Sequence, residues 1–296
     1  MRRGYRRSAP RPASIEALNP LLSPAAALGA AATLGVADFT GGVAGRRSPA
    51  PSVAIGVETV GFIAVPLALL LLPAQLDARA ALLAFAGGAV GGLGLIAFYR
   101  SMSLNLIGVV APITAVVAAA LPVGFGLLTG ETLHVGQIAG VAAGLVAIAL
   151  INSGGRGAGR NARLAVGLAI FAGVTFGLFF ILYHAASVAG VTAFVSGRLG
   201  SAVVSLVFVV ATRVSPVPVR SAWRLIAVGG SLDGVGVVLY LFATLHGLLS
   251  VSALLTSFYP AFTILCARLV LRERLSRSQA SGAVLAVVAV SAIAAA

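Results

Sequence analysis

The sequence has little charge, no lysine and a single cysteine. Only 9% of its 296 residues are charged, whereas 59% are hydrophobic. Soluble domains usually carry about 25% charged residues, so this composition excludes a water-soluble globular protein. The lone cysteine, Cys266, lies inside an apolar run, which excludes an intrachain disulfide and indicates a small packing residue. Most of the surface must therefore face lipid, as in an integral membrane protein.

The basic residues are all arginine, and they outnumber the acids by 20 to 7, which gives a net charge of +13. In a soluble protein this excess would indicate nucleic-acid binding. Here the arginines occupy short segments between apolar runs, where they determine membrane topology and contact anionic lipid headgroups. We therefore expect the lipid bilayer as a partner and no nucleic acid.

Residues 1–20 form a basic tail like the start of a signal peptide. The apolar run that follows is too long for a signal core, so we interpret it as the first membrane helix. A membrane-crossing helix needs about 20 mostly apolar residues. Ten such runs lie near 22–45, 51–73, 79–102, 107–129, 134–152, 163–185, 191–212, 222–246, 248–271 and 278–296. They predict a multi-pass protein of the cell membrane, either the inner or the plasma membrane.

The two halves of the chain repeat each other. With a shift of 142 residues and no gap, Gly87, Gly88, Gly92, Gly94, Thr114, Glu131, Gln137 and Gly140 fall on Gly229, Gly230, Gly234, Gly236, Thr256, Glu273, Gln279 and Gly282. The pattern predicts one five-helix repeat over 21–152, a linker over 153–162 and a second five-helix repeat over 163–296. Because five is odd, the second half enters the membrane from the opposite side, as in inverted-repeat transporters.

Several motifs resemble the EamA-type members of the drug/metabolite transporter superfamily. They are Gly35 to Phe39 with Arg46-Arg47, Pro112 to Thr114, Gly130-Glu131 with Gln137 and Gly140, Ser250 to Thr263, and Leu271 to Leu275 with Gln279. The resemblance implies an all-α membrane protein whose ten transmembrane helices form two inverted five-helix repeats around a central cavity. It also implies transport of amino acids, metabolites, nucleotide sugars or drugs. One departure from the family pattern, a first helix without tryptophan, argues against adopting any one member's substrate.

Ionisable residues inside the apolar runs cost at least about 2.5 kcal/mol each to insert, so each needs a reason. Asp38 and Glu58 reach a similar depth in the first two expected helices, where they could share a proton and couple transport to it. The alternative is that one of them pairs with Arg100 or caps a helix. Arg198 and Asp233 form a second expected pair, which either faces the cavity or joins two helices as a structural ion pair.

Two tyrosines and two prolines lie deep in the expected helices. Tyr240 and Tyr259 each carry a hydroxyl that needs a partner, so they either line a pocket or pack between helices. Pro122 and Pro260 interrupt the backbone hydrogen-bond ladder and are expected to kink their helices. Carbonyls freed in this way are tolerated in a membrane where they line a cavity.

The repeated positions also include helix-packing and capping residues. Two small-xxx-small spacings are expected to let helices approach closely: Gly88 with Gly92, and Gly230 with Gly234. Glu131 and Glu273 each follow the fourth helix of a repeat. We expect each carboxylate to bond the free backbone N–H groups at the start of the next helix.

These patterns predict a secondary active transporter of a small metabolite, amino acid or drug that works by alternating access. Export and proton coupling are the expected refinements. The alternatives are a membrane-embedded enzyme and a non-transporting scaffold, and the oligomeric alternative is a homodimer. The sequence has no His-Glu-x-x-His motif, no clear nucleophile–base pair and no Walker loop. We therefore expect no catalytic residue, no metal and no cofactor.

Two criteria for the orientation of the chain in the membrane disagree. The five arginines of the tail, and the family resemblance, favour a cytoplasmic N-terminus. The loops on the opposite side of the membrane hold more arginines than those on the side of the tail, and this favours the reverse. The side on which the termini lie stays open at the level of the sequence.

Overall fold

The computed structural model describes residues 21–104, 107–152 and 162–271, with four short pieces at 277–278, 281–282, 284–285 and 288–289. These residues form helices and no strand. Six stretches are long and apolar enough to cross a membrane: Leu22–Gly45, Ala50–Leu71, Ala78–Ser103, Arg163–Ala189, Val191–Thr212 and Arg220–Leu245. Shorter apolar helices accompany them. The expectation of a helical, multi-pass membrane protein is confirmed, whereas the number of ten spans stays a prediction.

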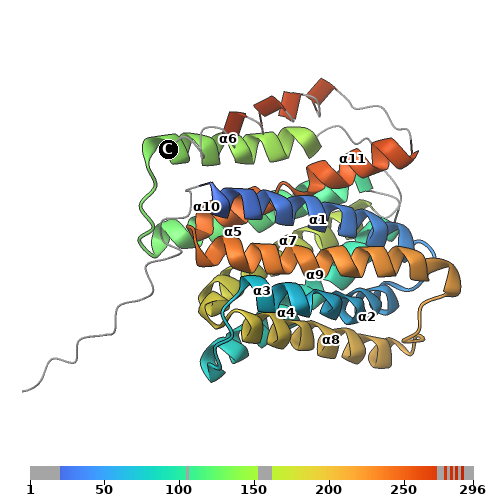
Figure 1. Ribbon diagram of the computed structural model, residues 1–296. Coiled ribbons are helices and arrows are strands. Elements are labelled where there is room, and N and C mark those ends of the chain that lie inside the picture. The colour runs from blue at the N-terminus through green and yellow to red at the C-terminus, as the bar shows by residue number, and fades with distance from the viewer. Residues whose placement is uncertain are drawn as a thin grey trace, which may run out of the picture.

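The helices follow the expected apolar runs closely (Figure 1). They are α1 (Leu22–Gly45), α2 (Ala50–Gly61), α3 (Val65–Leu71), α4 (Ala78–Ser103), α5 (Ile107–Leu128), α6 (Val135–Asn152), α7 (Ala162–Ala186), α8 (Val191–Thr212), α9 (Trp223–Leu245), α10 (Leu249–Thr256) and α11 (Tyr259–Leu271). Short 3-10 turns lie at Phe62–Ala64, Ser187–Ala189 and Arg220–Ala222. The tenth expected helix, 278–296, falls largely outside the described residues.

Two expected single helices are broken, each four residues before a proline. The run 51–73 is interrupted by the 3-10 turn that begins at Phe62, ahead of Pro66. The run 248–271 is divided after Thr256, ahead of Pro260. Proline lacks an N–H, and its ring clashes with the carbonyl four residues earlier, so the helical ladder stops at that carbonyl. The kink expected at Pro260 is therefore a full break, whereas α5 continues through Pro122.

The packing of the helices repeats between the two halves. Helix α1 packs on α9 as α7 packs on α4, and α4 packs on α8 as α9 packs on α2. Likewise α5 packs on α7, and its counterparts α10 and α11 pack on α1. Helix α6 lies at the edge of the bundle, at the top of Figure 1, where it contacts α5, α10 and α11. Each half therefore contributes helices to the centre of the molecule.

The small-xxx-small glycines lie where these helices come closest. A Cβ atom on Gly88 of α4 would lie 1.8 Å from the carbonyl oxygen of Gly197 in α8. A Cβ atom on Gly234 of α9 would lie 2.3 Å from the carbonyl oxygen of Gly61 in α2. The remaining two are similar, with Gly92 at 2.6 Å from Ser201 Oγ and Gly230 at 2.7 Å from the Val57 carbonyl. At these four positions no side chain fits between the backbones.

Candidate functional site

A cavity lies between the helices α1, α2, α4, α7, α8, α9 and α11. Its empty space is about 690 Å³, part of which is open to the outside. The charged groups in its wall are Asp38, Glu58, Arg198 and Asp233. The aromatic groups are Phe176, Phe179, Phe180, Tyr183, Tyr240 and Tyr259. The cavity therefore combines a small polar group with a mostly apolar surface rich in aromatic rings, as small-molecule sites usually do.

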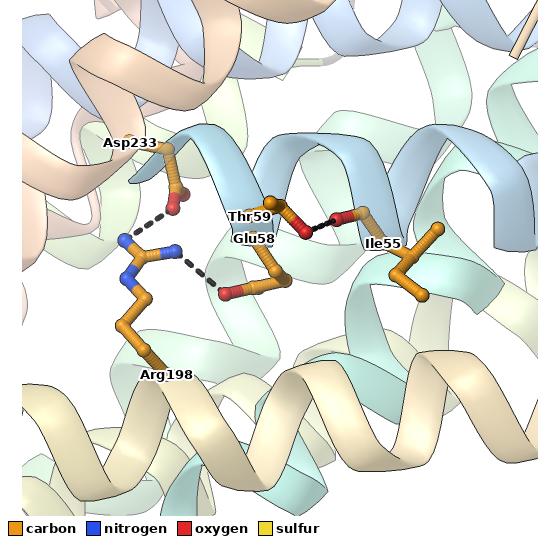
Figure 2. A network of polar contacts seen from close by, with 5 residues as sticks. All are labelled: Ile55, Glu58, Thr59, Arg198 and Asp233. Carbon is orange, nitrogen blue, oxygen red and sulfur yellow. Dashed lines mark hydrogen bonds and ion pairs between the residues drawn. The ribbon is translucent and has the colours of Figure 1, made fainter. Parts of the chain in front are cut away.

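Arg198 of α8 is held between two carboxylates (Figure 2). Its Nη1 atom donates to Glu58 Oε2 of α2 at 2.6 Å, and its Nη2 atom lies 2.5 Å from Asp233 Oδ2 of α9. The arginine side chain is only 2% exposed, so it needs such partners to offset the loss of hydration. Its guanidinium carbon also lies 5.5 Å from the centre of the Phe194 ring. The network joins α2 to α8 and α9.

Glycines create the space in which this network forms. A Cβ atom on Gly61, one helical turn after Glu58, would lie 2.8 Å from Arg198 Nη1. The same glycine presents its carbonyl oxygen to Gly234, the residue next to Asp233. Because neither glycine has a side chain, α2 and α9 approach each other closely and deliver one carboxylate each to Arg198. The packing glycines thus help to position the charged residues.

The structure corrects the partner expected for Glu58. Glu58 and Asp38 both line the cavity, as expected from their depth, but Glu58 binds Arg198 and not Asp38. Arg100, the other expected partner, is exposed near the end of α4. Depth along a helix is readable from the sequence, whereas the face that α2 turns toward α8 depends on packing. The expected contact between Arg198 and Asp233 is present.

The two deep tyrosines both reach the cavity, with different surroundings. Tyr240 Oη donates a hydrogen bond to the Phe180 carbonyl at 2.8 Å. The hydroxyl of Tyr259 is buried and has no hydrogen-bond partner among the described residues. Tyr259 is the first residue of α11, directly after the break that precedes Pro260.

The sequence did not single out the aromatic face of α7. Phe176, Phe179, Phe180 and Tyr183 recur at spacings of three and four residues, which places them on one side of a helix. Ring centres lie 4.2 Å apart for Phe179 and Tyr183, and 4.7 Å apart for Phe180 and Tyr240. The spacing was visible in the sequence, but in a helix that is apolar on all sides it does not identify the face that meets a cavity.

Glu131 is a capping residue, but not of the helix that was expected. Its carboxylate accepts hydrogen bonds from the backbone N–H groups of Leu249 at 2.6 Å and Ser250 at 3.1 Å. It also accepts one from the Ser250 hydroxyl. These are the first residues of α10 and not of α6, because α5 and α10 pack side by side. The expectation that Glu131 caps the next helix is therefore wrong, and Glu273 lies outside the described residues.

No metal site was found in the part of the chain that the structure describes. Within these residues, no group of three or more His, Cys, Asp and Glu side chains is placed to hold a metal ion. The polar centre of the cavity consists of carboxylates, a guanidinium and hydroxyls. Such groups bind a solute by hydrogen bonds and charge.

Comparison with known proteins finds a family match for the second half of the chain. Residues 163–295 match the EamA-like transporter family. This part of the chain is therefore similar to that family. The family is part of the drug/metabolite transporter superfamily. The EamA-like segment contains Arg198, Asp233, Tyr240 and Tyr259, whereas Asp38 and Glu58 precede it.

The overall fold is shared with proteins of known structure. One crystal structure superposes with a TM-score of 0.67 over 92% of this chain and 95% of the other, at 19% sequence identity. At that identity the likeness concerns the fold alone. No curated protein matches the sequence. The EamA-like family and the cavity therefore carry the functional argument.

Proposed function

We propose that this EamA-like protein is a secondary active transporter that moves a small molecule across the cell membrane by alternating access. The observation that carries the proposal is the buried network around Arg198, which lies in the wall of the central cavity. A buried charge in a membrane protein is costly and usually marks a substrate or ion pathway. The network receives Glu58 from one half of the chain and Asp233 from the other.

The repeated architecture supports alternating access. The bounds 78–103 of α4, shifted by 142 residues, become 220–245, which are the bounds of the span Arg220–Leu245. The same shift moves the first residue of α5, Ile107, onto the first residue of α10, Leu249. We infer two five-helix units, 21–152 and 163–296, joined by 153–162 and inverted relative to each other. Such units can exchange conformations and so open the cavity to each side in turn.

The network offers a means of linking substrate to conformation. The cavity wall holds three carboxylates and one guanidinium, so Arg198 can keep one partner while another is released. Glu58 comes from α2 of the first unit, whereas Arg198 comes from α8 of the second. Any movement of one unit against the other must therefore either break this ion pair or shift both of its residues together. We infer that its rearrangement accompanies the change of access.

Asp38 is the better of the two candidates for proton coupling. Glu58 is already bound by Arg198, whereas Asp38 makes no hydrogen bond or ion pair with the described residues. A group that gains and loses a proton during transport must be reachable from the cavity, and Asp38 lies in its wall. The charged groups around it are Glu58, Asp233 and Arg198. We therefore assign the proton to Asp38, with export as the direction that the family resemblance implies.

Counterflow in proteoliposomes tests the proposal. The full chain is reconstituted in vesicles loaded with 2-phenylethylamine, L-phenylalanine or 3-phenylpropionate, and uptake of the same labelled compound is followed. A carrier exchanges at least one of these probes faster than protein-free vesicles loaded with the same probe do. Arg198→Ala abolishes this exchange. Arg224→Ala, which removes an exposed arginine of α9, is the matched control and should behave like the parent. Equal exchange by Arg198→Ala and the parent would refute the role given to the network.

A further inference from the structure

One carboxylate of the cavity has no partner among the described residues. Asp38 of α1 is 8% exposed and lies in the cavity wall, and it makes no hydrogen bond or ion pair with the described residues. The other two carboxylates of the wall, Glu58 and Asp233, are both bound to Arg198. A buried carboxylate without a partner is costly, so the site is incomplete without a bound cation or a proton.

A second unpartnered group lies on the helix that faces Asp38. Tyr259 is 3% exposed, lines the same cavity, and its hydroxyl has no partner among the described residues. A Cβ atom on Gly35 would lie 2.3 Å from the Tyr259 carbonyl oxygen, so α1 and α11 touch at this point. The Thr263 hydroxyl donates to the Gly35 carbonyl at 2.9 Å and fixes the contact. Asp38 follows Gly35 by three residues, on the same side of α1.

The charge of the cavity favours a cation over an anion. Arg198 is the positively charged side chain in the wall, and its two terminal nitrogens are occupied by Glu58 and Asp233. An anionic ligand that bound the remaining N–H groups of Arg198, of which Nε has no partner among the described residues, would lie next to Glu58, Asp233 and Asp38. A cationic ligand reaches Asp38 without breaking an existing pair. The free charge that the site offers to a ligand is therefore negative.

Aromatic rings surround the remaining space. Phe179, Phe180, Tyr183 and Tyr240 form a connected group, with ring centres 4.2 Å apart for Phe179–Tyr183 and 4.7 Å apart for Phe180–Tyr240. Aromatic faces attract cations and bury apolar groups. A solute that combines a positive charge with an apolar body complements both parts of the cavity.

We propose that Asp38 and Tyr259 form the subsite for the ammonium group of a protonated amine. The ammonium donates one hydrogen bond to the Asp38 carboxylate and one to the Tyr259 hydroxyl oxygen, and the aromatic group holds the apolar body of the ligand. The subsite rests on the proposed transport function and specifies its substrate class, a small organic amine. It also brings together one helix from each half of the chain, α1 and α11.

Three probes that share one apolar body test this subsite. Binding of 2-phenylethylamine, 3-phenylpropionate and 2-phenylethanol to the purified full chain in detergent is measured by calorimetry near neutral pH. We expect the amine to bind and both other probes to bind at least roughly tenfold more weakly, because hydrogen bonds to a charged group contribute about 1.5–3 kcal/mol. Asp38→Asn should weaken amine binding by roughly 10–100-fold, and Tyr259→Phe by roughly 2–10-fold.

A matched control separates the subsite from general effects on folding. Asp77→Asn removes an acid outside the cavity, at the N-cap of α4, where asparagine caps as well as aspartate does. It should bind the amine like the parent. Size-exclusion chromatography checks that each variant is folded.

Several results would overturn the subsite. They are an amine that binds no more tightly than 3-phenylpropionate, and an unchanged amine affinity in folded Asp38→Asn. If Asp38→Asn does not yield folded protein, an unchanged affinity in Tyr259→Phe overturns the subsite instead. Transport is judged separately by counterflow. Exchange of 3-phenylpropionate without amine binding would refute the amine subsite and leave the transport proposal standing. Amine binding without exchange of any probe would refute the transport proposal and leave the amine subsite standing.

Discussion

The carboxylate of Glu58 lies 2.6 Å from the guanidinium of Arg198, although 140 residues separate the two in the chain. Asp233 holds the other terminal nitrogen of the same guanidinium. The arrangement is asymmetric, because removing either acid leaves Arg198 with one partner, whereas removing Arg198 takes the ion-pair partner from two carboxylates, the buried one of Glu58 and the partly buried one of Asp233. This asymmetry makes the contribution of each residue measurable.

Arg198→Ala is expected to lower thermal stability more than Glu58→Gln does. Loss of one member of a buried ion pair costs about 3–5 kcal/mol when a charge remains unpaired. Arg198→Ala strands two carboxylates, whereas Glu58→Gln leaves Arg198 with Asp233. Thermal unfolding of the purified variants in detergent gives the order, with Arg224→Ala as the control. A larger loss of stability in Glu58→Gln would contradict the shared network.

Gly88→Ala is expected to disturb the contact between α4 and α8. The added Cβ atom would lie 1.8 Å from a backbone oxygen, so the helices must separate to admit it. The matched control is Gly124→Ala in α5, because nothing lies within 4 Å of a Cβ atom at that position. Replacing a helical glycine by alanine without a clash stabilises by about 0.5–1 kcal/mol. The temperature of thermal unfolding should therefore fall for Gly88→Ala and stay level or rise for Gly124→Ala.

Glu131→Ala is expected to loosen the start of α10. The carboxylate accepts two backbone N–H groups there, and loss of a helix cap costs about 1 kcal/mol. Hydrogen exchange should become faster at the Leu249 and Ser250 amides, with little change at the start of α4. The control is Asp77→Asn, which keeps its cap. Unchanged protection of the two amides in Glu131→Ala would show that the carboxylate does not hold them in the membrane.

Cysteine labelling in intact cells tests the inverted topology. Leu76, in the loop before α4, and Val217, in the corresponding loop before α9, are both exposed. In a Cys266→Ser background, an impermeant thiol reagent should label Leu76→Cys and Val217→Cys from opposite sides of the membrane. Thr129→Cys, after α5, should match Leu76→Cys if α5 crosses the bilayer. Labelling of positions 76 and 217 from one side would refute the inversion, and either result shows where the termini lie.

Asp38→Asn is expected to abolish flux driven by a pH gradient, because an amide cannot bind or release the proton. Amine exchange should be lost with it, since the same carboxylate holds the ammonium. Both are measured in proteoliposomes with labelled 2-phenylethylamine, with Asp77→Asn as the control. Full gradient-driven flux in Asp38→Asn would rule out the assigned proton site. Loss of driven flux with exchange intact would keep the proton at Asp38 and remove the amine from it.

The sequence alone determined where the helices lie. Expected run 191–212 has the bounds of α8, and run 22–45 has those of α1. In lipid every backbone polar group must bond within the chain, so a long apolar run has hardly any alternative to a helix. The charged residues of the cavity were also readable, because an aspartate or arginine inside such a run is conspicuous and expensive.

Only the tertiary structure decided which residues meet. Nothing in the sequence favours Arg198 over Asp38 as the partner of Glu58, or α10 over α6 as the helix that Glu131 caps. A helix that is apolar on every side has no polar face to mark its orientation, since lipid and protein interior suit the same side chains. The rotation of each helix, and the neighbour it meets, follow from close packing at glycines such as Gly61 and Gly234, whose partners lie far away in the chain.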